Sequence, residues 1–128
     1  GTGDTQLTFA QEIKMDGAII VSTPQEVALL DVKRGIKMFD KLGVKILGLV
    51  DNMSFFTGDD GKKYKIFGEG GVKKTADEFQ KEFLGEIPIN PKVGKCGDEG
   101  KPIVEADPSH EISKIYLDFA SKIKSTYL

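Results

Sequence analysis

The residues best suited to binding a ligand follow two apolar, β-branched runs. The first run spans residues 17–23, and the chain leaves it through Thr-Pro-Gln at 23–25. The second run spans residues 44–50 and is followed by Asp-Asn-Met-Ser at 51–54. Ligands of doubly wound sheets bind at the carboxyl ends of such strands. Asn52 is the preferred candidate, because a side-chain amide both donates and accepts hydrogen bonds, as the edge of an adenine ring requires. Capping of the next turn is its alternative role.

A glycine-rich segment at residues 68–75, Gly-Glu-Gly-Gly-Val-Lys-Lys-Thr, is close to the phosphate-binding pattern G-x-x-x-x-G-K-[ST]. Lys73 stands where that pattern requires its second glycine, and the segment follows a hairpin pattern rather than a buried strand. We therefore expect Gly70 and Gly71 to open a helix rather than wrap a phosphate. A weak anion site at the start of that helix is the alternative.

The other reactive side chains stand alone. Cys96 is the only cysteine, which excludes an internal disulfide and fits a reducing compartment. One thiolate per chain cannot hold an iron–sulfur cluster without partner chains. His110 is the only histidine, and we expect a surface residue with no metal or catalytic role. No nucleophile motif is present, so no catalytic residue and no metal site is predicted.

Composition narrows the class of protein. The chain has 128 residues, of which 39% are hydrophobic, enough for one domain or part of one. Charged residues make up 30% but nearly cancel to a net charge of −2, so we expect no nucleic-acid partner. No apolar run approaches the roughly 20 residues that cross a bilayer, so we expect a soluble protein with no membrane partner. The single cysteine favours the cytoplasm as its location.

The order of the elements predicts an α/β fold. Residues 17–23, 44–50 and 83–89 read as strands, and apolar residues at helical spacing predict helices over residues 25–42 and 71–82. A glycine- and lysine-rich loop is expected from residue 90 to about 106. Asp107 as N-cap and Pro108 at the first helical position then predict a last helix. Alternating strands and helices indicate a doubly wound, mostly parallel sheet.

Residues 54–68 interrupt this alternation. Aromatic residues lie on both sides of a turn-forming Asp-Asp-Gly at 59–61, which predicts a small hairpin insertion. We expect the aromatic side chains to be buried under the hairpin. An exposed contact surface is the alternative.

Six segments together carry a family resemblance, in their order and spacing: Gly-Thr-Gly-Asp at 1–4, Thr-Pro-Gln-Glu-Val-Ala at 23–28, Asp-Asn-Met-Ser at 51–54, Ile-Phe-Gly-Glu-Gly-Gly at 66–71, Phe-Leu-Gly-Glu-Ile-Pro at 83–88 and Gly-Asp-Glu-Gly-Lys-Pro at 97–102. The chain resembles the carboxyl-terminal half of Mrp/ApbC/Nbp-type proteins. These are deviant-Walker P-loop ATPases related to MinD and ParA, which carry iron–sulfur clusters and work as homodimers. The resemblance implies that residues 1–128 form a single partial domain of a P-loop ATPase-like fold.

The resemblance also implies which part of an ATP site is present. Gly3 and Asp4 resemble the tail of the switch II segment, and Asn52 resembles an adenine-reading asparagine flanked by Pro88, Ile89 and Asn90. The Walker A loop, its magnesium-binding hydroxyl and the Walker B strand have no counterpart in these residues. ATP and magnesium are therefore expected in a full-length parent, while this chain alone is expected not to hydrolyse ATP.

One departure from the family concerns the cluster itself. Family members that bridge a cluster carry Cys-x-x-Cys in the hairpin, where this chain has Phe-Thr-Gly-Asp-Asp at 56–60. Partners implied are a second copy, the missing amino-terminal half and iron–sulfur recipient proteins. The alternatives are a non-catalytic protein-binding module and a diverged ParA/MinD-like ATPase without cluster-binding cysteines.

Overall fold

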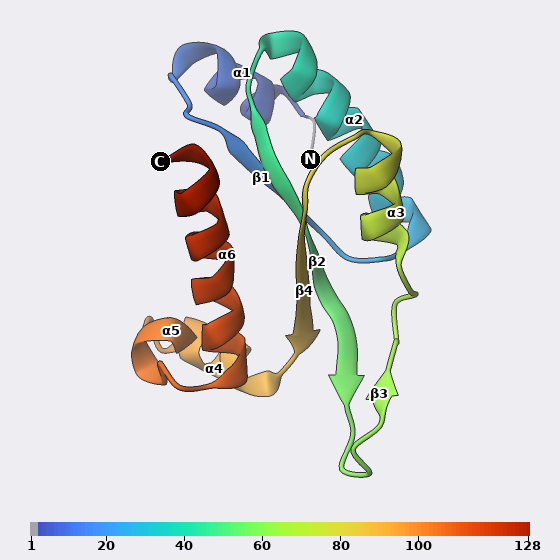
Figure 1. Ribbon diagram of the computed structural model, residues 1–128, viewed down its shortest axis with the longest axis vertical. Coiled ribbons are helices and arrows are strands. Elements are labelled where there is room, and N and C mark those ends of the chain that lie inside the picture. Colours follow the sequence, from blue (N-terminus) through green and yellow to red (C-terminus); the bar gives the residue numbers. More distant parts are fainter. Residues whose placement is uncertain (1–2) are drawn as a thin grey trace.

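The computed structural model describes residues 3–128, and its centre is a sheet with a long middle strand. Strand β2 (Ile46–Thr57) pairs in parallel with β1 (Ala18–Ser22) and with β4 (Phe83–Ile89). At its carboxyl end, β2 also forms an antiparallel hairpin with β3 (Lys63–Tyr64) (Figure 1). The sheet is therefore mixed but mostly parallel, as the sequence predicts.

Helices cover both faces of this sheet. Helices α2 (Glu26–Leu42) and α3 (Gly71–Glu78) pack on one face, around Ile36, Leu49 and Val72. On the other face, α6 (Glu111–Tyr127) packs together with α4 (Pro91–Asp98) and α5 (Ile103–Ala106). Helix α1 (Asp4–Glu12) lies at the end of the molecule opposite the hairpin (Figure 1). Two apolar clusters, one on each face, thus hold the layers together.

The βαβ unit β1–α2–β2 follows directly from the residue pattern. Val32, Gly35 and Ile36 recur at helical spacing and are buried against the sheet, as predicted. The helix ends at Gly43, whose φ of 71° is a left-handed conformation that glycine adopts without strain. This places the carboxyl end of β1, at Ser22, beside Asp51 of β2.

Several predictions about the elements after residue 70 are wrong. Residues 91–98 form helix α4 instead of a loop, because Pro91 at the first helical position and the Asn90 cap start a helix. Asp107 does not cap α6; it ends the short helix α5, and His110 caps α6 by accepting a hydrogen bond from the amide of Ile112 at 3.1 Å. Helix α3 ends at Glu78, four residues before the predicted end.

The hairpin aromatics are less buried than predicted. Phe56 is 36% exposed and Tyr64 is 46% exposed, and their neighbour Ile66 is 59% exposed. Tyr64 donates a hydrogen bond to Asp60 across the turn, so the hairpin is held by contacts within itself rather than by a covering layer. The expected burial is therefore wrong for Phe56 and Tyr64, whereas Phe55 and Phe67 are half-buried. The exposed side chains support the alternative of a contact surface.

Strand β1 is an edge within the described residues. It pairs with β2 alone there, and two apolar side chains along it, Ile19 and Val21, are 42% and 58% exposed. Ile20, between them, packs instead toward α2 and α3. One face of β1 is thus apolar and uncovered, next to unpaired backbone groups that can accept another strand.

Candidate nucleotide-base site

Asn52 lies at the edge of the sheet where the parallel strands end. It is half-buried, and its register partner on β4 is Ile87. Just beyond it, Met53 has a positive φ of 54° and the β2–β4 register shifts. Ser54 then donates a hydrogen bond to the Ile87 carbonyl oxygen at 3.4 Å. The bulge therefore fixes Asn52 beside the end of β4.

The residues after Ile87 complete this edge. Pro88 is buried and Ile89 is half-buried, so the chain leaves β4 with little freedom. Asn90 accepts a hydrogen bond from the amide of Lys92 at 2.9 Å through Oδ1, which caps α4. The structure thus brings Asn52 together with the segment 88–90. Asn90 has a structural role there that the sequence-based interpretation did not include.

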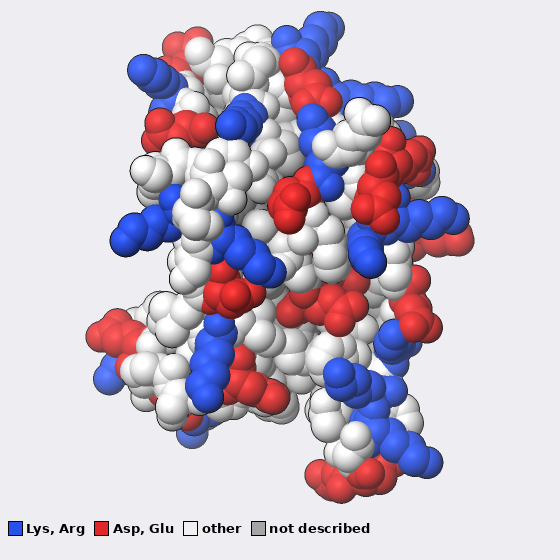
Figure 2. Space-filling model, viewed as in Figure 1, with Lys and Arg blue, Asp and Glu red and all other residues white. Residues whose placement is uncertain are grey.

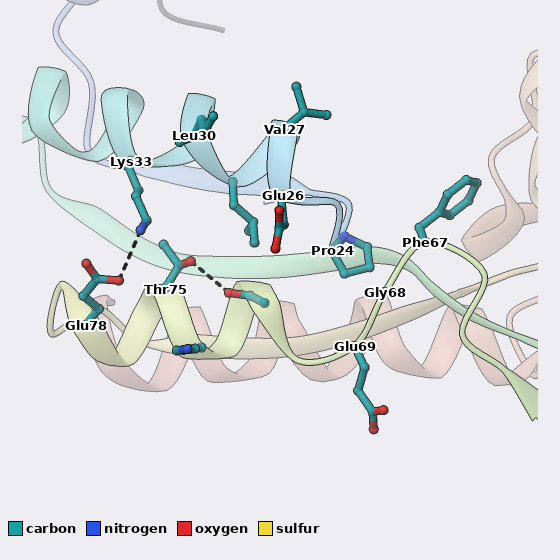
Figure 3. Close-up of a pocket in the computed structure, with 13 residues that line it drawn as sticks. Pro24, Glu26, Val27, Leu30, Lys33, Phe67, Gly68, Glu69, Thr75 and Glu78 are labelled. Atoms are coloured by element: carbon teal, nitrogen blue, oxygen red, sulfur yellow. Dashed lines mark hydrogen bonds and ion pairs between the residues drawn. The ribbon is translucent and has the colours of Figure 1, made fainter.

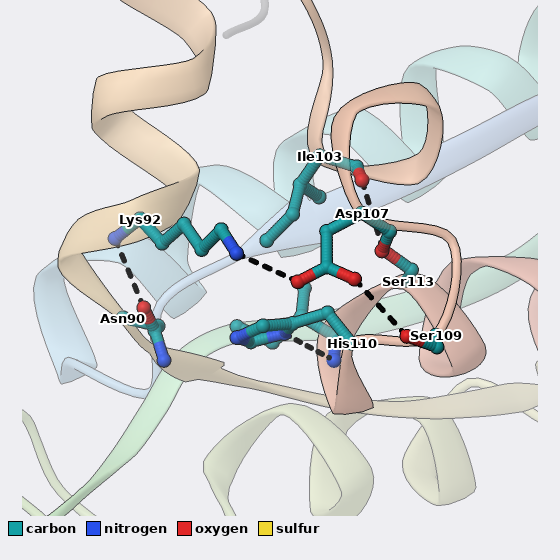
Figure 4. A network of polar contacts seen from close by, with 8 residues as sticks. Asn90, Lys92, Ile103, Asp107, Ser109, His110 and Ser113 are labelled. Atoms are coloured by element: carbon teal, nitrogen blue, oxygen red, sulfur yellow. Dashed lines mark hydrogen bonds and ion pairs between the residues drawn. The ribbon is translucent and has the colours of Figure 1, made fainter.

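A polar network ties this edge to the turn before α6 (Figure 4). The Lys92 ammonium lies 2.6 Å from Oδ2 of Asp107, while Ser109 donates to Oδ1 of the same carboxylate at 3.1 Å. The hydrogen bond from Lys92 is the main reason that the pKa of Asp107 lies below its usual range. The hydroxyl of Ser113, fully buried, donates to the Asp107 carbonyl at 2.6 Å. The start of α4 is therefore held by α6.

Asp51, next to Asn52, is a residue that sequence reasoning missed. It is 2% exposed, and its Oδ1 has no hydrogen-bond partner among the described residues. Burial, and second the charge of Glu86 on β4, raise the pKa of Asp51 to about 6, although Lys65 acts in the opposite direction. A single aspartate after a strand gives no sequence signal for this, since the burial comes from packing across three strands and a loop.

Gly3 and Asp4 are not brought to this edge. Gly3 precedes the first turn of α1 and Asp4 begins it, and both are exposed. Because α1 lies at the opposite end of the molecule from the hairpin, these residues do not meet Asn52 (Figure 1). The other two residues of the predicted switch II tail, Gly1 and Thr2, lie outside the described residues.

A groove of about 840 Å³ lies elsewhere, between α2 and α3 (Figure 3). An ion pair between Lys33 and Glu78, at 3.4 Å, crosses it, and the exposed side chains of Val27 and Leu30 lie along α2. The glycine-rich segment does open a helix as predicted: Gly70 is the left-handed N-cap of α3, and the Thr75 hydroxyl donates to the Gly71 carbonyl at 2.8 Å. That threonine is thus engaged within its own helix.

The sequence matches one family over nearly its whole length. The description "ParA: NUBPL iron-transfer P-loop NTPase" covers residues 1–124. The chain belongs to this family.

Curated relatives agree with the assignment. An iron-sulfur cluster carrier protein of Aquifex aeolicus is 44% identical over 121 residues, which are 94% of this chain and 33% of that protein. A protein of Arabidopsis thaliana described as "Iron-sulfur protein required for NADH dehydrogenase, mitochondrial" is 46% identical over 124 residues, 96% of this chain and 40% of the relative. This NUBPL-family chain therefore spans roughly a third to two fifths of the relatives that it matches.

Solved structures show the same fold. A nucleotide-binding protein of Archaeoglobus fulgidus in complex with ADP is 40% identical, with a TM-score of 0.70 over 79% of this chain and 42% of that one. The MinD cell division ATPase of Pyrococcus furiosus, at 24% identity and a TM-score of 0.66 over 86% of this chain, supports the fold alone. The predicted P-loop NTPase-like, ParA/MinD-related architecture is confirmed.

The described part of the chain has few side chains placed to ligate a cluster or a metal ion. Cys96 is 5% exposed and points into the apolar cluster beneath α4 and α6, away from the hairpin. Among residues 3–128, no group of three or more His, Cys, Asp or Glu side chains is placed to hold a metal ion. The hairpin offers aromatic, carboxylate and ammonium groups but no thiolate. The described residues therefore do not fit an iron–sulfur cluster.

Charge and hydropathy add two observations. Figure 2 shows lysine and arginine side chains interspersed with aspartate and glutamate over the visible face, with no broad area of one sign. None of the helices in the described part of the chain has the length and apolar character needed to cross a bilayer.

Proposed function

We propose that this chain is the base-binding, carboxyl-terminal part of an ATP-binding protein that carries or transfers iron–sulfur clusters. The proposal rests above all on the edge formed by Asn52 and the segment 88–90, in a chain 40% identical to a nucleotide-binding protein that holds ADP. The names of the curated relatives support an iron–sulfur cluster as the cargo. In a full-length parent, ATP and magnesium would bind with the help of residues outside these 128.

The geometry favours recognition of the base rather than of the phosphates. Asn52 offers an amide beside the end of β4, where Pro88 and Ile89 supply apolar contact for a flat ring. The one phosphate-like segment, at residues 68–75, has its threonine hydroxyl occupied by the Gly71 carbonyl. Gly3 and Asp4 would act, as the switch II tail, only when the rest of a nucleotide site places them near the phosphates.

The uncovered face of β1 supports a partner for this half. Ile19 and Val21 are exposed beside an open strand edge, which favours association with the missing half of the fold or with a second copy. A homodimer in the cytoplasm, with iron–sulfur recipient proteins as clients and no nucleic acid or membrane, is the assembly that we infer. Cluster transfer would then use ligands other than hairpin thiolates of this chain.

Photoaffinity labelling with 2-azidoadenosine tests the base site directly. After illumination, the chain should be labelled within residues 88–92. Adenosine and ATP should compete with the label about equally, because the phosphates of ATP have no binding partners at this site. Guanosine should compete poorly. Asn52→Asp keeps the size of the side chain but replaces a donor and acceptor by an acceptor, so labelling should fall several-fold.

Ser125→Ala provides the matched control, since that residue is exposed and its hydroxyl donates to the Lys122 carbonyl within α6. It should label like the unchanged chain. Labelling spread over other segments, or labelling that persists in Asn52→Asp, would contradict the base site and with it the proposed function.

A further inference from the structure

The buried carboxylate of Asp51 is not used by the proposed nucleotide site. It lies two positions after Leu49 on β2, so both side chains point to the face covered by α2 and α3, while Asn52 points to the other face. A carboxylate that is 2% exposed and leaves Oδ1 without a partner is a costly arrangement. Its partner must therefore be a proton or a cationic group.

Few charged groups act on this carboxylate. From β4, Glu86 lies directly opposite Asp51 in the strand register, and from the segment after β3 comes Lys65. From β1, the register partner Ser22 contributes a hydroxyl, which donates to the Thr23 carbonyl at 2.8 Å. Among residues 3–128, Lys65 is thus the one cation identified as acting on the pKa of Asp51, and its charge also interacts with that of Glu86.

Lys65, however, is bonded elsewhere. Its ammonium contacts the carboxylate of Glu69 four residues on, and the two side chains are 39% and 71% exposed. The charges of Glu86 and Asp51 also act on Lys65, so that together with Glu69 they raise its pKa. The charges of three carboxylates therefore act on one ammonium: those of Glu69 and Glu86, which are exposed, and that of Asp51, which is buried.

The position of these residues links the sheet to the hairpin. Asp51 precedes the bulge at Met53, beyond which Phe56 of β2 pairs with both β4 and β3, and Lys65 follows β3 directly on the returning arm of the hairpin. A bond between Lys65 and Asp51 would close the base of the hairpin onto the sheet.

We propose that Asp51 and Lys65 form a proton-linked latch at the base of the hairpin. When Asp51 is protonated, Lys65 bonds Glu69, as in the structure. When Asp51 loses its proton, Lys65 turns to the Asp51–Glu86 pair and draws the hairpin toward the sheet. The proton goes to solvent, and no other group is needed to balance the step. The latch does not depend on nucleotide binding.

An NMR titration of the chain between pH 4 and 8 tests the latch. The Asp51 carboxyl carbon should titrate near pH 6, and the Lys65 Nζ signal should move with the same midpoint. In Asp51→Asn the Lys65 step should disappear. In Lys65→Gln the Asp51 midpoint should rise, and in Glu69→Gln it should fall, because Lys65 is then free to bond Asp51.

Lys62→Gln is the control, since Lys62 lies on the same hairpin but does not act on the pKa of Asp51. It should leave the common midpoint unchanged. A Lys65 step that survives Asp51→Asn overturns the latch, and so does an Asp51 midpoint that does not move in Lys65→Gln. Lys65→Gln keeps the test decisive if Asp51→Asn folds poorly.

Discussion

Asp51 and Glu86 lie directly opposite each other on the neighbouring parallel strands β2 and β4. Like charges at such positions repel, and burial adds to the repulsion by disfavouring the ionised form of Asp51. The arrangement sets a pH dependence for the whole fold.

The Asp51→Asn substitution should change that dependence. Because the folded-state pKa of Asp51 is raised from 3.8 to about 6, its contribution to stability is present below pH 3.8 and is lost as the pH rises through 6. The loss amounts to at most about 3 kcal/mol. Urea unfolding should therefore show that the free energy of unfolding of Asp51→Asn, relative to that of the unchanged chain, is higher at pH 8 than at pH 4. An equal difference at both pH values would contradict this assignment.

Self-association should depend on the β1 edge. The exposed apolar side chains of Ile19 and Val21 next to an unpaired strand favour aggregation or dimer formation, which light scattering detects. Val21→Lys should shift the chain toward monomer. Val27→Lys, at a valine that is 73% exposed on α2, is the matched control and should not. A monomeric unchanged chain would show that the edge does not drive association.

The helix cap at His110 should be measurable. Its Nδ1 accepts a hydrogen bond from the Ile112 amide at 3.1 Å, and loss of such a cap costs about 0.5–2 kcal/mol. Thermal unfolding of His110→Ala should show a loss in this range, and His110→Asn should restore most of it, since asparagine is a good cap. Equal stability of His110→Ala and the unchanged chain would exclude the cap.

Cluster binding should require added thiolates. Iron and sulfide supplied to the unchanged chain should give no visible absorption of a bound cluster, because its single cysteine is buried on the inner side of α4. The double change Phe56→Cys and Asp59→Cys restores the family spacing on an exposed hairpin, and the absorption should then appear. Cluster uptake by the unchanged chain that survives Cys96→Ala would require other ligands and contradict the prediction.

Much of the fold could be predicted from the sequence pattern, and the predictions that failed have identifiable causes. The strands at 83–89 and around 46–50 and the stripe of α2 were predictable because apolar spacing dominates there. Helix α4 was missed because two glycines obscure it, although its cap and proline were readable. Asp107 has the residue type of an N-cap, but the preceding residues form α5 and move the cap to His110.

The site was predictable only in part. Asn52 could be placed because it follows a buried strand, whereas Asp51 could not be recognised as buried, since its surroundings come from β1, β4 and the loop after β3. The exposure of Phe56 and Tyr64 was missed for a related reason. Burial of a hairpin depends on what lies beneath it, and the local sequence does not contain that information.

Calorimetric titration of the chain with adenosine and with ATP plus magnesium tests the central claim most directly. If these residues recognise only the base, both ligands should bind weakly and with similar affinity, and no ATP should be hydrolysed. Sub-micromolar, magnesium-dependent binding of ATP would contradict the claim, because it would require a phosphate site within these 128 residues.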